Sequence, residues 1–168
     1  MVRVDDGESR RAHRYAADAW INANRDWWES FVPDGSANQR ERALETWRSK
    51  TEGVSKEVTK LCKHLRYTPE RAGTLVGRDG GPFLRMGIDL YAQYQRYLQA
   101  RGGLDFDDLI WRAMDALAQD AAFLAALRRR WPYILEDEAQ DSSPLQQEIL
   151  SLLAGDALAW VRVGDPNQ

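Results

Sequence analysis

Apolar residues recur three or four positions apart through most of the chain, a spacing that predicts amphipathic helices. The first such stretch, residues 8–32, ends at a Pro-Asp-Gly-Ser turn, and its apolar positions are Ala16, Trp20, Ala23, Trp27 and Phe31. The second stretch, residues 38–66, alternates steps of three and four, which predicts one long helix with a narrow seam for an antiparallel helical neighbour. The seam consists of Leu44, Trp47, Thr51, Val54, Val58, Leu61 and Leu65.

Shorter helices are predicted to follow. Thr68 and Pro69 are typical of a helix start, and the glycine-rich segment 77–82 predicts a linker. The next helix has its apolar face at Leu84, Ile88, Tyr91, Gln95 and Leu98. It is expected to stop at Gly102-Gly103, after which Asp105 caps a helix whose buried face is Phe106, Ile110, Ala113 and Leu117. A further helix is expected over 121–130.

The pattern changes after Trp131-Pro132. Residues 133–136 and 159–163 are short apolar segments typical of strands, and the segment from Ser143 through Leu153 between them has helical spacing. A strand, a helix and a second strand predict a parallel crossover unit, in which chemistry gathers at the carboxyl ends of the strands. The expected fold is therefore mainly α, with two short parallel strands near the end of the chain.

Composition limits the class of protein. The chain has 168 residues, 43% apolar and 29% charged, which is typical of a folded domain rather than a disordered chain. No apolar run approaches the roughly 20 residues that cross a bilayer, and the first residues lack the layout of a secretory signal. The single cysteine, Cys62, excludes an internal disulfide. These features favour a cytoplasmic protein without a membrane partner.

Charge is distributed unevenly along the chain. Residues 1–104 contain 18 Lys+Arg and 14 Asp+Glu, a balance of +4, whereas residues 105–168 contain 5 and 12, a balance of −7. The first part is able to face phosphates, and the acidic part is able to hold a divalent cation. Ordinary variation of surface charge is the alternative explanation, especially for the basic part.

The acidic pair Asp137-Glu138 follows the first predicted strand. One carboxylate at a strand tip can bind magnesium, and its neighbour can polarise an attacking water, which are the two tasks that phosphoryl transfer requires. The second strand ends in Gly164-Asp165-Pro166-Asn167-Gln168, which adds specificity to the pair. An acidic helix start without catalytic duty is the alternative.

These segments together resemble the UvrD/Rep/PcrA-like superfamily 1 DNA helicases. Residues 134–141 resemble motif II of that family, its Walker B element, and residues 163–168 resemble motif III. Residues 104–109 resemble the acidic-Phe-Leu segment that precedes motif II, and residues 63–70 are similar to a looser Lys-rich, Pro-Glu segment. The resemblance is strong over residues 84–168 and weak over residues 1–83.

The resemblance implies a role for each matching position. Glu138 would act as general base or orient the hydrolytic water, and Gln168 would sense the γ-phosphate and couple it to DNA. Asp137 would coordinate the Mg²⁺ bound to ATP. Gln140 and Asp141 would link the nucleotide state to motif III, and Asp165 would support the motif III loop. Together with Asp137, these three residues are the candidates for binding the nucleotide.

The resemblance also implies a domain arrangement. Residues 1–103 would form a helical accessory (1B-like) subdomain, and residues 104–168 part of a RecA-like α/β P-loop NTPase motor domain. The parent enzyme would use ATP and Mg²⁺ to move 3′ to 5′ on single-stranded DNA in repair or replication, with its accessory domain at junction DNA. A non-catalytic helical module that binds protein or DNA is the competing hypothesis.

Two departures from the family pattern change the expectation. The sequence contains no Gly-x-x-x-x-Gly-Lys-Ser/Thr, and its Gly77–Gly81 segment has no lysine. We therefore expect a P-loop segment upstream and a second RecA-like domain downstream, and no activity from this chain alone. Glu136 stands where the family usually has an apolar residue, so it faces solvent, a cation or a neighbouring subdomain.

Candidate DNA contacts lie in the first part of the chain. Lys56, Lys60, Lys63 and Arg66 share one surface of the long predicted helix, and Trp28 breaks the apolar stripe, which favours exposure and base stacking. Packing in the core is the alternative for the tryptophans on apolar faces. The two predicted strands would leave open edges, so we expect the N-terminal helices or a second chain to cover them.

Overall fold

The computed structural model describes all residues except 1, 33–34, 78, 156–158 and 166–168. The chain divides into two compact units, Met1–Asp105 (unit 1) and Phe106–Gln168 (unit 2). The expected mainly α fold with two short parallel strands near the end of the chain is confirmed. The assignment of the two units to an accessory and a motor domain stays a prediction.

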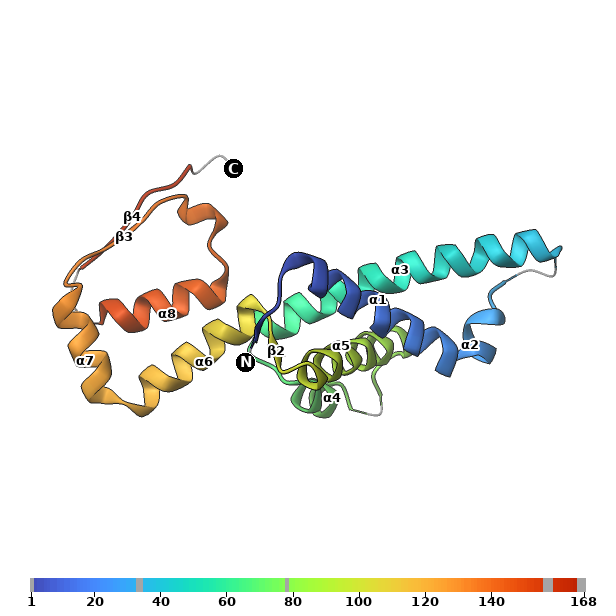
Figure 1. The fold of residues 1–168 in the computed structure, drawn as a ribbon, viewed down its shortest axis with the longest axis horizontal. Helices are drawn as coiled ribbons and strands as arrows, with labels where there is room; N and C mark the ends of the chain where they lie inside the picture. Colours follow the sequence, from blue (N-terminus) through green and yellow to red (C-terminus); the bar gives the residue numbers. More distant parts are fainter. Residues whose placement is uncertain (1, 33–34, 78, 156–158, 166–168) are drawn as a thin grey trace. The chain divides into compact units, whose positions relative to one another are not determined.

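Unit 1 is built on a long helix and the helices that pack against it. Helix α5 packs against α1, α3 and α4, and α1 also packs against α3 (Figure 1). The short strands β1 (Val2–Arg3) and β2 (Gly103–Leu104) pair in parallel and connect the two ends of the unit. Its helices are α1 (Asp6–Ala23), α2 (Arg25–Glu29), α3 (Ala37–His64), α4 (Pro69–Val76) and α5 (Pro82–Ala100).

The core of unit 1 is rich in aromatic side chains from α1 and α5. Trp20, Tyr91 and Tyr94 are buried there with alanines of α1, and half-buried residues of α3 pack against them. Burial of such large apolar surfaces is the main favourable contribution to folding. The single cysteine, Cys62, lies in the same core, and its thiol has a pKa raised by burial.

The prediction of one helix over residues 8–32 is wrong. Helix α1 ends at Ala23 because Asn24 has non-helical φ and ψ of −121° and 35°, and its side-chain amide donates to the carbonyl of Trp20 at 2.9 Å. The chain restarts as α2, whose N-cap is Asn24. Of the face that was expected to be buried, Trp27 still packs against the core, whereas Phe31, which lies beyond the end of α2, is 57% exposed.

The long helix is confirmed, but its buried face differs from the predicted seam. Leu61 and Leu65, which the seam includes, are more than half exposed. The buried stripe runs in four-residue steps through small or polar side chains, namely Thr51, Ser55, Thr59 and Lys63. We attribute the change to two neighbours, α1 and α5, whose close approach favours small side chains over a single leucine seam.

A buried polar network lies within this interface. Lys63 is fully buried, and its Nζ lies 2.5 Å from Oδ2 of Asp105. The same carboxylate oxygen accepts a hydrogen bond from the hydroxyl of Tyr94 at 2.8 Å. The ring of His13 stacks on Tyr94 with centroids 4.2 Å apart, and its Nδ1 is 2.9 Å from Oγ of Ser55. The network thus connects α1, α3 and α5 with the last residue of unit 1.

We expect His13 to make unit 1 sensitive to acid. Burial, reinforced by the charge of Lys56, lowers the pKa of His13 to about 4. Because this pKa lies below the usual value of about 6.5, the unfolded chain takes up the proton first, and stability is lost as pH falls from about 6.5 towards 4. Urea unfolding near neutral and mildly acid pH measures the effect. A His13→Gln variant should show a shallower pH dependence, and equal slopes in the two proteins would contradict this expectation.

Unit 2 contains the predicted strand–helix–strand crossover. Strands β3 (Ile134–Glu136) and β4 (Trp160–Arg162) pair in parallel, with Glu136 opposite Arg162. Helix α8 (Pro144–Ala154) connects them, and its Leu145 packs in a small core with residues of α6. The remaining elements of the unit are α6 (Phe106–Gln119), α7 (Ala121–Arg130) and the short 3-10 helix η1 (Ala139–Asp141).

One face of this strand pair is apolar and open. Tyr133, Leu135, Val161 and Val163 are each more than half exposed. Parallel strands in folded proteins are usually covered on both faces, so such a surface is typical of one that another polypeptide covers. Self-association through the strands stays a prediction.

None of the helices in the described part of the chain is both long enough and apolar enough to span a membrane.

Candidate nucleotide-hydrolysis site

The carboxyl ends of β3 and β4 lie side by side. The backbone N–H of Val163 donates to the carbonyl of Glu136 at 2.8 Å, and the N–H of Ala139 donates to the carbonyl of Val163 at 2.9 Å. These bonds continue the parallel pairing beyond the strands. They bring the Asp137-Glu138 pair next to the segment that begins at Gly164, as the crossover pattern predicts.

Asp137 is exposed at the tip of β3. Its Oδ1 accepts a hydrogen bond from the backbone N–H of Glu138 at 2.9 Å. Within the described residues, no group of three or more His, Cys, Asp or Glu side chains is placed to hold a metal ion. Magnesium is commonly bound by one or two carboxylates together with substrate phosphates and water, so the single exposed Asp137 fits a site of that kind.

Glu138 has a left-handed backbone conformation, with φ of 51° and ψ of 45°. The chain turns there into η1, and the N–H of Asp141 donates to the carbonyl of Glu138 at 2.9 Å. A non-glycine residue rarely adopts this conformation unless its surroundings require it. The side chain is held as well, because Nε2 of Gln140 donates to Oε2 of Glu138 at 2.6 Å.

The amide of Gln140 connects the two strand ends. Its Nε2 binds the carboxylate of Glu138, and its Oε1 accepts the backbone N–H of Asp165 at 3.0 Å. One side chain therefore contacts the proposed catalytic carboxylate and the loop after β4. The role of Gln140 in linking the nucleotide state to motif III stays a prediction.

Replacing Gly164 by alanine is expected to disconnect this amide. A Cβ at Gly164 would lie 2.4 Å from Oε1 of Gln140 and 3.2 Å from the backbone nitrogen of Ala139. The side chain of Gln140 can move, so we expect a loss of stability below about 1 kcal/mol. The amide of Asp165 should exchange with solvent faster, as measured by NMR. In a Gly53→Ala control, the added methyl meets no atom within 4 Å and this exchange should not change.

Glu136 is buried rather than facing solvent. It is 8% exposed, and its Oε2 accepts hydrogen bonds from Nε of Arg162 at 2.7 Å and from Nε1 of Trp160 at 3.0 Å. Its Oε1 accepts one from the hydroxyl of Ser142. The bond from Ser142 and the charge and bonds of Arg162 hold the pKa of Glu136 below its usual value.

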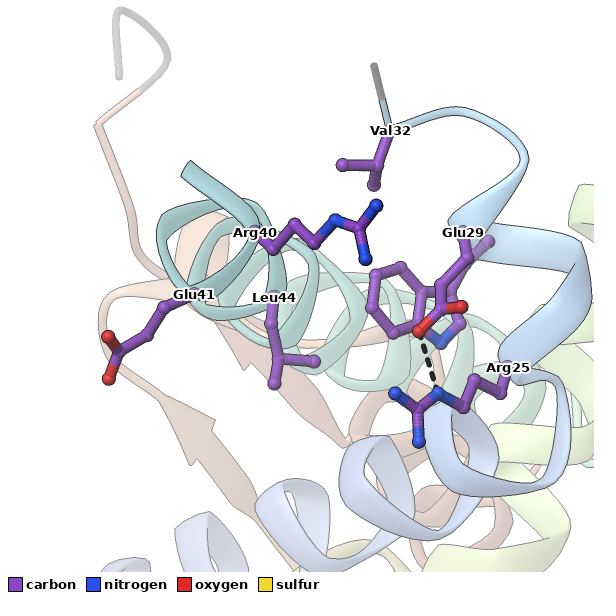
Figure 2. A pocket seen from close by; sticks show the side chains of 7 residues that line it. Arg25, Glu29, Val32, Arg40, Glu41 and Leu44 are labelled. Atoms are coloured by element: carbon purple, nitrogen blue, oxygen red, sulfur yellow. Dashed lines mark hydrogen bonds and ion pairs between the residues drawn. The ribbon is translucent and has the colours of Figure 1, made fainter. Parts of the chain in front are cut away.

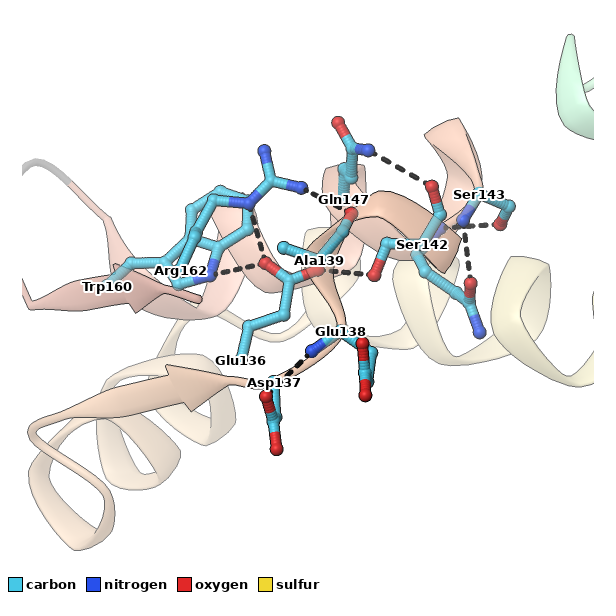
Figure 3. A network of polar contacts seen from close by, with 10 residues as sticks. Glu136, Asp137, Glu138, Ala139, Ser142, Ser143, Gln147, Trp160 and Arg162 are labelled. Carbon is cyan, nitrogen blue, oxygen red and sulfur yellow. Dashed lines mark hydrogen bonds and ion pairs between the residues drawn. The ribbon is translucent and has the colours of Figure 1, made fainter. Parts of the chain in front are cut away.

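The buried position of Glu136 therefore keeps its carboxylate away from those of the two acids that follow it. Figure 3 shows the carboxylates of Asp137 and Glu138 on the other side of the backbone from that of Glu136, which faces Trp160 and Arg162. Of the alternatives open from the sequence, the cation is the one observed, and it comes from β4. Arg162 was not among the predicted site residues, although a basic residue in an otherwise apolar strand was a usable signal.

The remaining site candidates are Asp141, Asp165 and Gln168. The backbone of Asp165 contacts Gln140, and Asp141 is exposed in η1. Gln168 lies outside the described residues. The nucleotide roles of these residues stay predictions.

Two of the candidate DNA contacts are not accessible. Lys63 is fully buried against Asp105, and Trp28 is only 6% exposed because the break at Asn24 turns it inward. The indole N–H of Trp28 donates to the carbonyl of Ile21 at 3.0 Å. The exposure expected for both residues is therefore wrong.

Trp28 instead contributes to the wall of a pocket between α2 and the start of α3. The pocket is charged at its rim, where Nε of Arg25 binds Oε1 of Glu29 at 2.6 Å (Figure 2). On the other candidate surface, Lys60 is exposed, Lys56 is 43% exposed beside Glu52, and Arg66 is half-buried. These three residues stay candidates for DNA contact.

Adjacent acids at the carboxyl end of a parallel strand, beside the segment that begins at Gly164, fit the arrangement expected of a phosphoryl-transfer domain. The family model described as UvrD/REP helicase N-terminal domain matches residues 9–168, and the chain belongs to this family. The match extends well beyond the motifs and includes most of unit 1.

Curated relatives include several bacterial helicases. The chain is 41% identical over 83 residues to the ATP-dependent DNA helicase UvrD2 of Mycobacterium tuberculosis, covering 47% of this chain and 12% of that protein. It is 33% identical over 86 residues to the RecBCD enzyme subunit RecB of Mycolicibacterium smegmatis, covering 51% and 8%. It is 29% identical over 116 residues to UvrD1 of M. tuberculosis, covering 69% and 15%. The matches thus span 8–15% of the length of these relatives.

Proposed function

We propose that this chain supplies motifs II and III of an ATP-dependent DNA helicase that moves 3′ to 5′ on single-stranded DNA. The observation that carries the proposal is the Gln140 amide, which contacts both Glu138 and the backbone of Asp165. A motor that converts hydrolysis into movement needs such a connection between its catalytic carboxylate and a neighbouring loop. Family membership and the helicases among the relatives support the same function.

The exposed carboxylates divide the chemistry between them. Asp137 would hold Mg²⁺, which when bound neutralises charge on the phosphates of ATP. Glu138 would accept a hydrogen bond from the attacking water and orient it, while Gln140 holds its other oxygen. Gln168 would sense the γ-phosphate. Each step uses positioning and charge rather than covalent chemistry by the protein.

DNA binding is assigned to unit 1. Lys56, Lys60 and Arg66 are the remaining candidates for contact with phosphates of single-stranded or junction DNA. Because the sequence contains no P-loop lysine, a P-loop segment and a second RecA-like domain of a longer protein would complete the motor. This chain alone is then expected to be inactive.

DNA-stimulated ATP hydrolysis tests the proposal. The complete helicase that contains this chain is compared with the isolated chain, each with and without single-stranded DNA. Turnover by the complete protein that requires DNA, together with a silent isolated chain, supports the proposed function. Absence of DNA-stimulated turnover in the complete protein would favour the competing function, a non-catalytic interaction module.

A further inference from the structure

The carboxylate of Glu136 connects three parts of unit 2 that surround the Asp137-Glu138 pair. Its Oε1 accepts a hydrogen bond from the hydroxyl of Ser142, the residue that follows the 137–141 turn. Its Oε2 accepts hydrogen bonds from Nε1 of Trp160 at 3.0 Å and from Nε of Arg162 at 2.7 Å, and both donors are on β4 (Figure 3). One buried side chain therefore binds the two ends of the 137–141 turn to each other and to the neighbouring strand.

Arg162 extends this connection into the turn itself. One of its terminal nitrogens donates to the carbonyl of Ala139 at 3.3 Å, and its guanidinium lies 4.9 Å from the centre of the Trp160 ring. The N–H of Ala139 donates to the carbonyl of Val163. The residue after Glu138 is thus held by β4 through its N–H and through its carbonyl.

Glu138 needs this support because of its left-handed backbone. Such a conformation persists in a glutamate only where the surrounding contacts over-determine it. We propose that Glu136 is a positioning residue for ATP hydrolysis, and that with Arg162 it braces the 137–141 turn so that the Glu138 carboxylate is presented at the end of β3. This inference rests on the proposed function.

Hydrogen exchange in the full 168-residue chain tests whether the brace exists. A Glu136→Gln variant keeps the shape of the side chain and one acceptor oxygen, but it loses the charge that faces Arg162. We expect the amide of Ala139 to exchange about tenfold faster in this variant, because a weakened brace opens more often. Unchanged exchange would overturn the proposal.

Arg128→Gln provides the matched control for unit 2. Arg128 donates to the carbonyl of Leu152 at 2.7 Å, a charged contact that does not involve the turn. Exchange at Ala139 should remain at the wild-type rate in this variant. Equal acceleration in both variants would mean that the unit loosens as a whole, and it would overturn a specific brace.

Turnover by the complete helicase then tests the positioning role. Glu136→Gln is expected to lower kcat about tenfold, as for other supporting residues, while KM for ATP and DNA binding stay unchanged. Adding Arg162→Gln should lower kcat little further, because the two residues act as one brace. A loosened turn with wild-type kcat would overturn the positioning role.

The two measurements separate the inference from the function on which it rests. If the complete wild-type protein shows no DNA-stimulated turnover, the proposed function fails and the catalytic role of the brace fails with it. The exchange measurement still reports whether Glu136 holds the turn. If the wild-type protein shows DNA-stimulated turnover and the Glu136→Gln variant has the same kcat, the inference alone fails.

Discussion

Glu138→Gln is expected to lower DNA-stimulated ATP hydrolysis by the complete helicase at least about 100-fold, the lower end of the usual contribution of a general base. The substitution keeps an oxygen that can accept the hydrogen bond from Gln140, which is 2.6 Å long in the native chain. It removes only the charge and the basicity. Initial rates at saturating ATP and single-stranded DNA measure the loss, and DNA binding should be retained.

Glu148→Gln is the control for this change. Glu148 is exposed on α8, outside the turn that carries Glu138, and the substitution makes the same chemical change. Its rate should stay close to that of the wild type. Similar rates for wild type and Glu138→Gln would remove Glu138 from catalysis, whereas an equal loss in both variants would point to damage to unit 2.

Asp137 allows the two carboxylates to be distinguished. If Asp137 holds the metal, Asp137→Asn should raise the Mg²⁺ concentration needed for half-maximal rate, whereas Glu138→Gln should leave that requirement unchanged. The geometry supports this division, because the two side chains are exposed and have different partners: Asp137 accepts a backbone N–H, and Glu138 accepts the Gln140 amide.

The sequence was sufficient for features that local periodicity determines. The long helix α3, the break at Gly102-Gly103 and the crossover of unit 2 follow from the spacing of apolar residues and from glycine and proline. The Asp137-Glu138 pair was also recognisable, because a short apolar strand followed by two acids is a local signal. These features need no knowledge of which segments meet in space.

Features that depend on distant contacts were not predictable in the same way. Lys63 looks like a surface cation in a helix, and only its pairing with Asp105, 42 residues away, buries it. The helix break at Asn24 decides which way Trp28 faces, and the apolar spacing continues through that break without a sign of it. Both errors arise because tertiary contacts override the local pattern.

The candidate site shows the same division. The neighbours Asp137 and Glu138 are adjacent in the sequence, but the partner of Glu136 is fixed by the register of β3 and β4. A single strand does not reveal that register. Two opposite charges in otherwise apolar strands were a signal that they pair, since an unpaired buried charge is costly.

Lys63→Met is expected to destabilise unit 1 by about 3–5 kcal/mol, the usual cost of removing one partner from a buried ion pair. Methionine can fill the space of the lysine stem, but it leaves the carboxylate of Asp105 without an ammonium group 2.5 Å away. Urea unfolding followed by tryptophan fluorescence measures the change, because four of the seven tryptophans, namely Trp20, Trp27, Trp28 and Trp47, lie in unit 1. A loss below about 1 kcal/mol would show that the pair contributes little.

Combining Lys63→Met with Asp105→Asn should restore much of this stability. The asparagine removes the uncompensated charge and still offers an oxygen to the hydroxyl of Tyr94, which donates to Asp105 at 2.8 Å.

The double variant also separates folding from DNA binding. It lacks the charge of Lys63 in a folded unit, so it should bind single-stranded DNA with the affinity and salt dependence of the wild type, because a fully buried ammonium releases no counterions. Lys60→Met should weaken binding and reduce that salt dependence if the exposed side of α3 contacts phosphates. Equal weakening in the double variant and in Lys60→Met would mean that Lys63 becomes exposed when DNA binds.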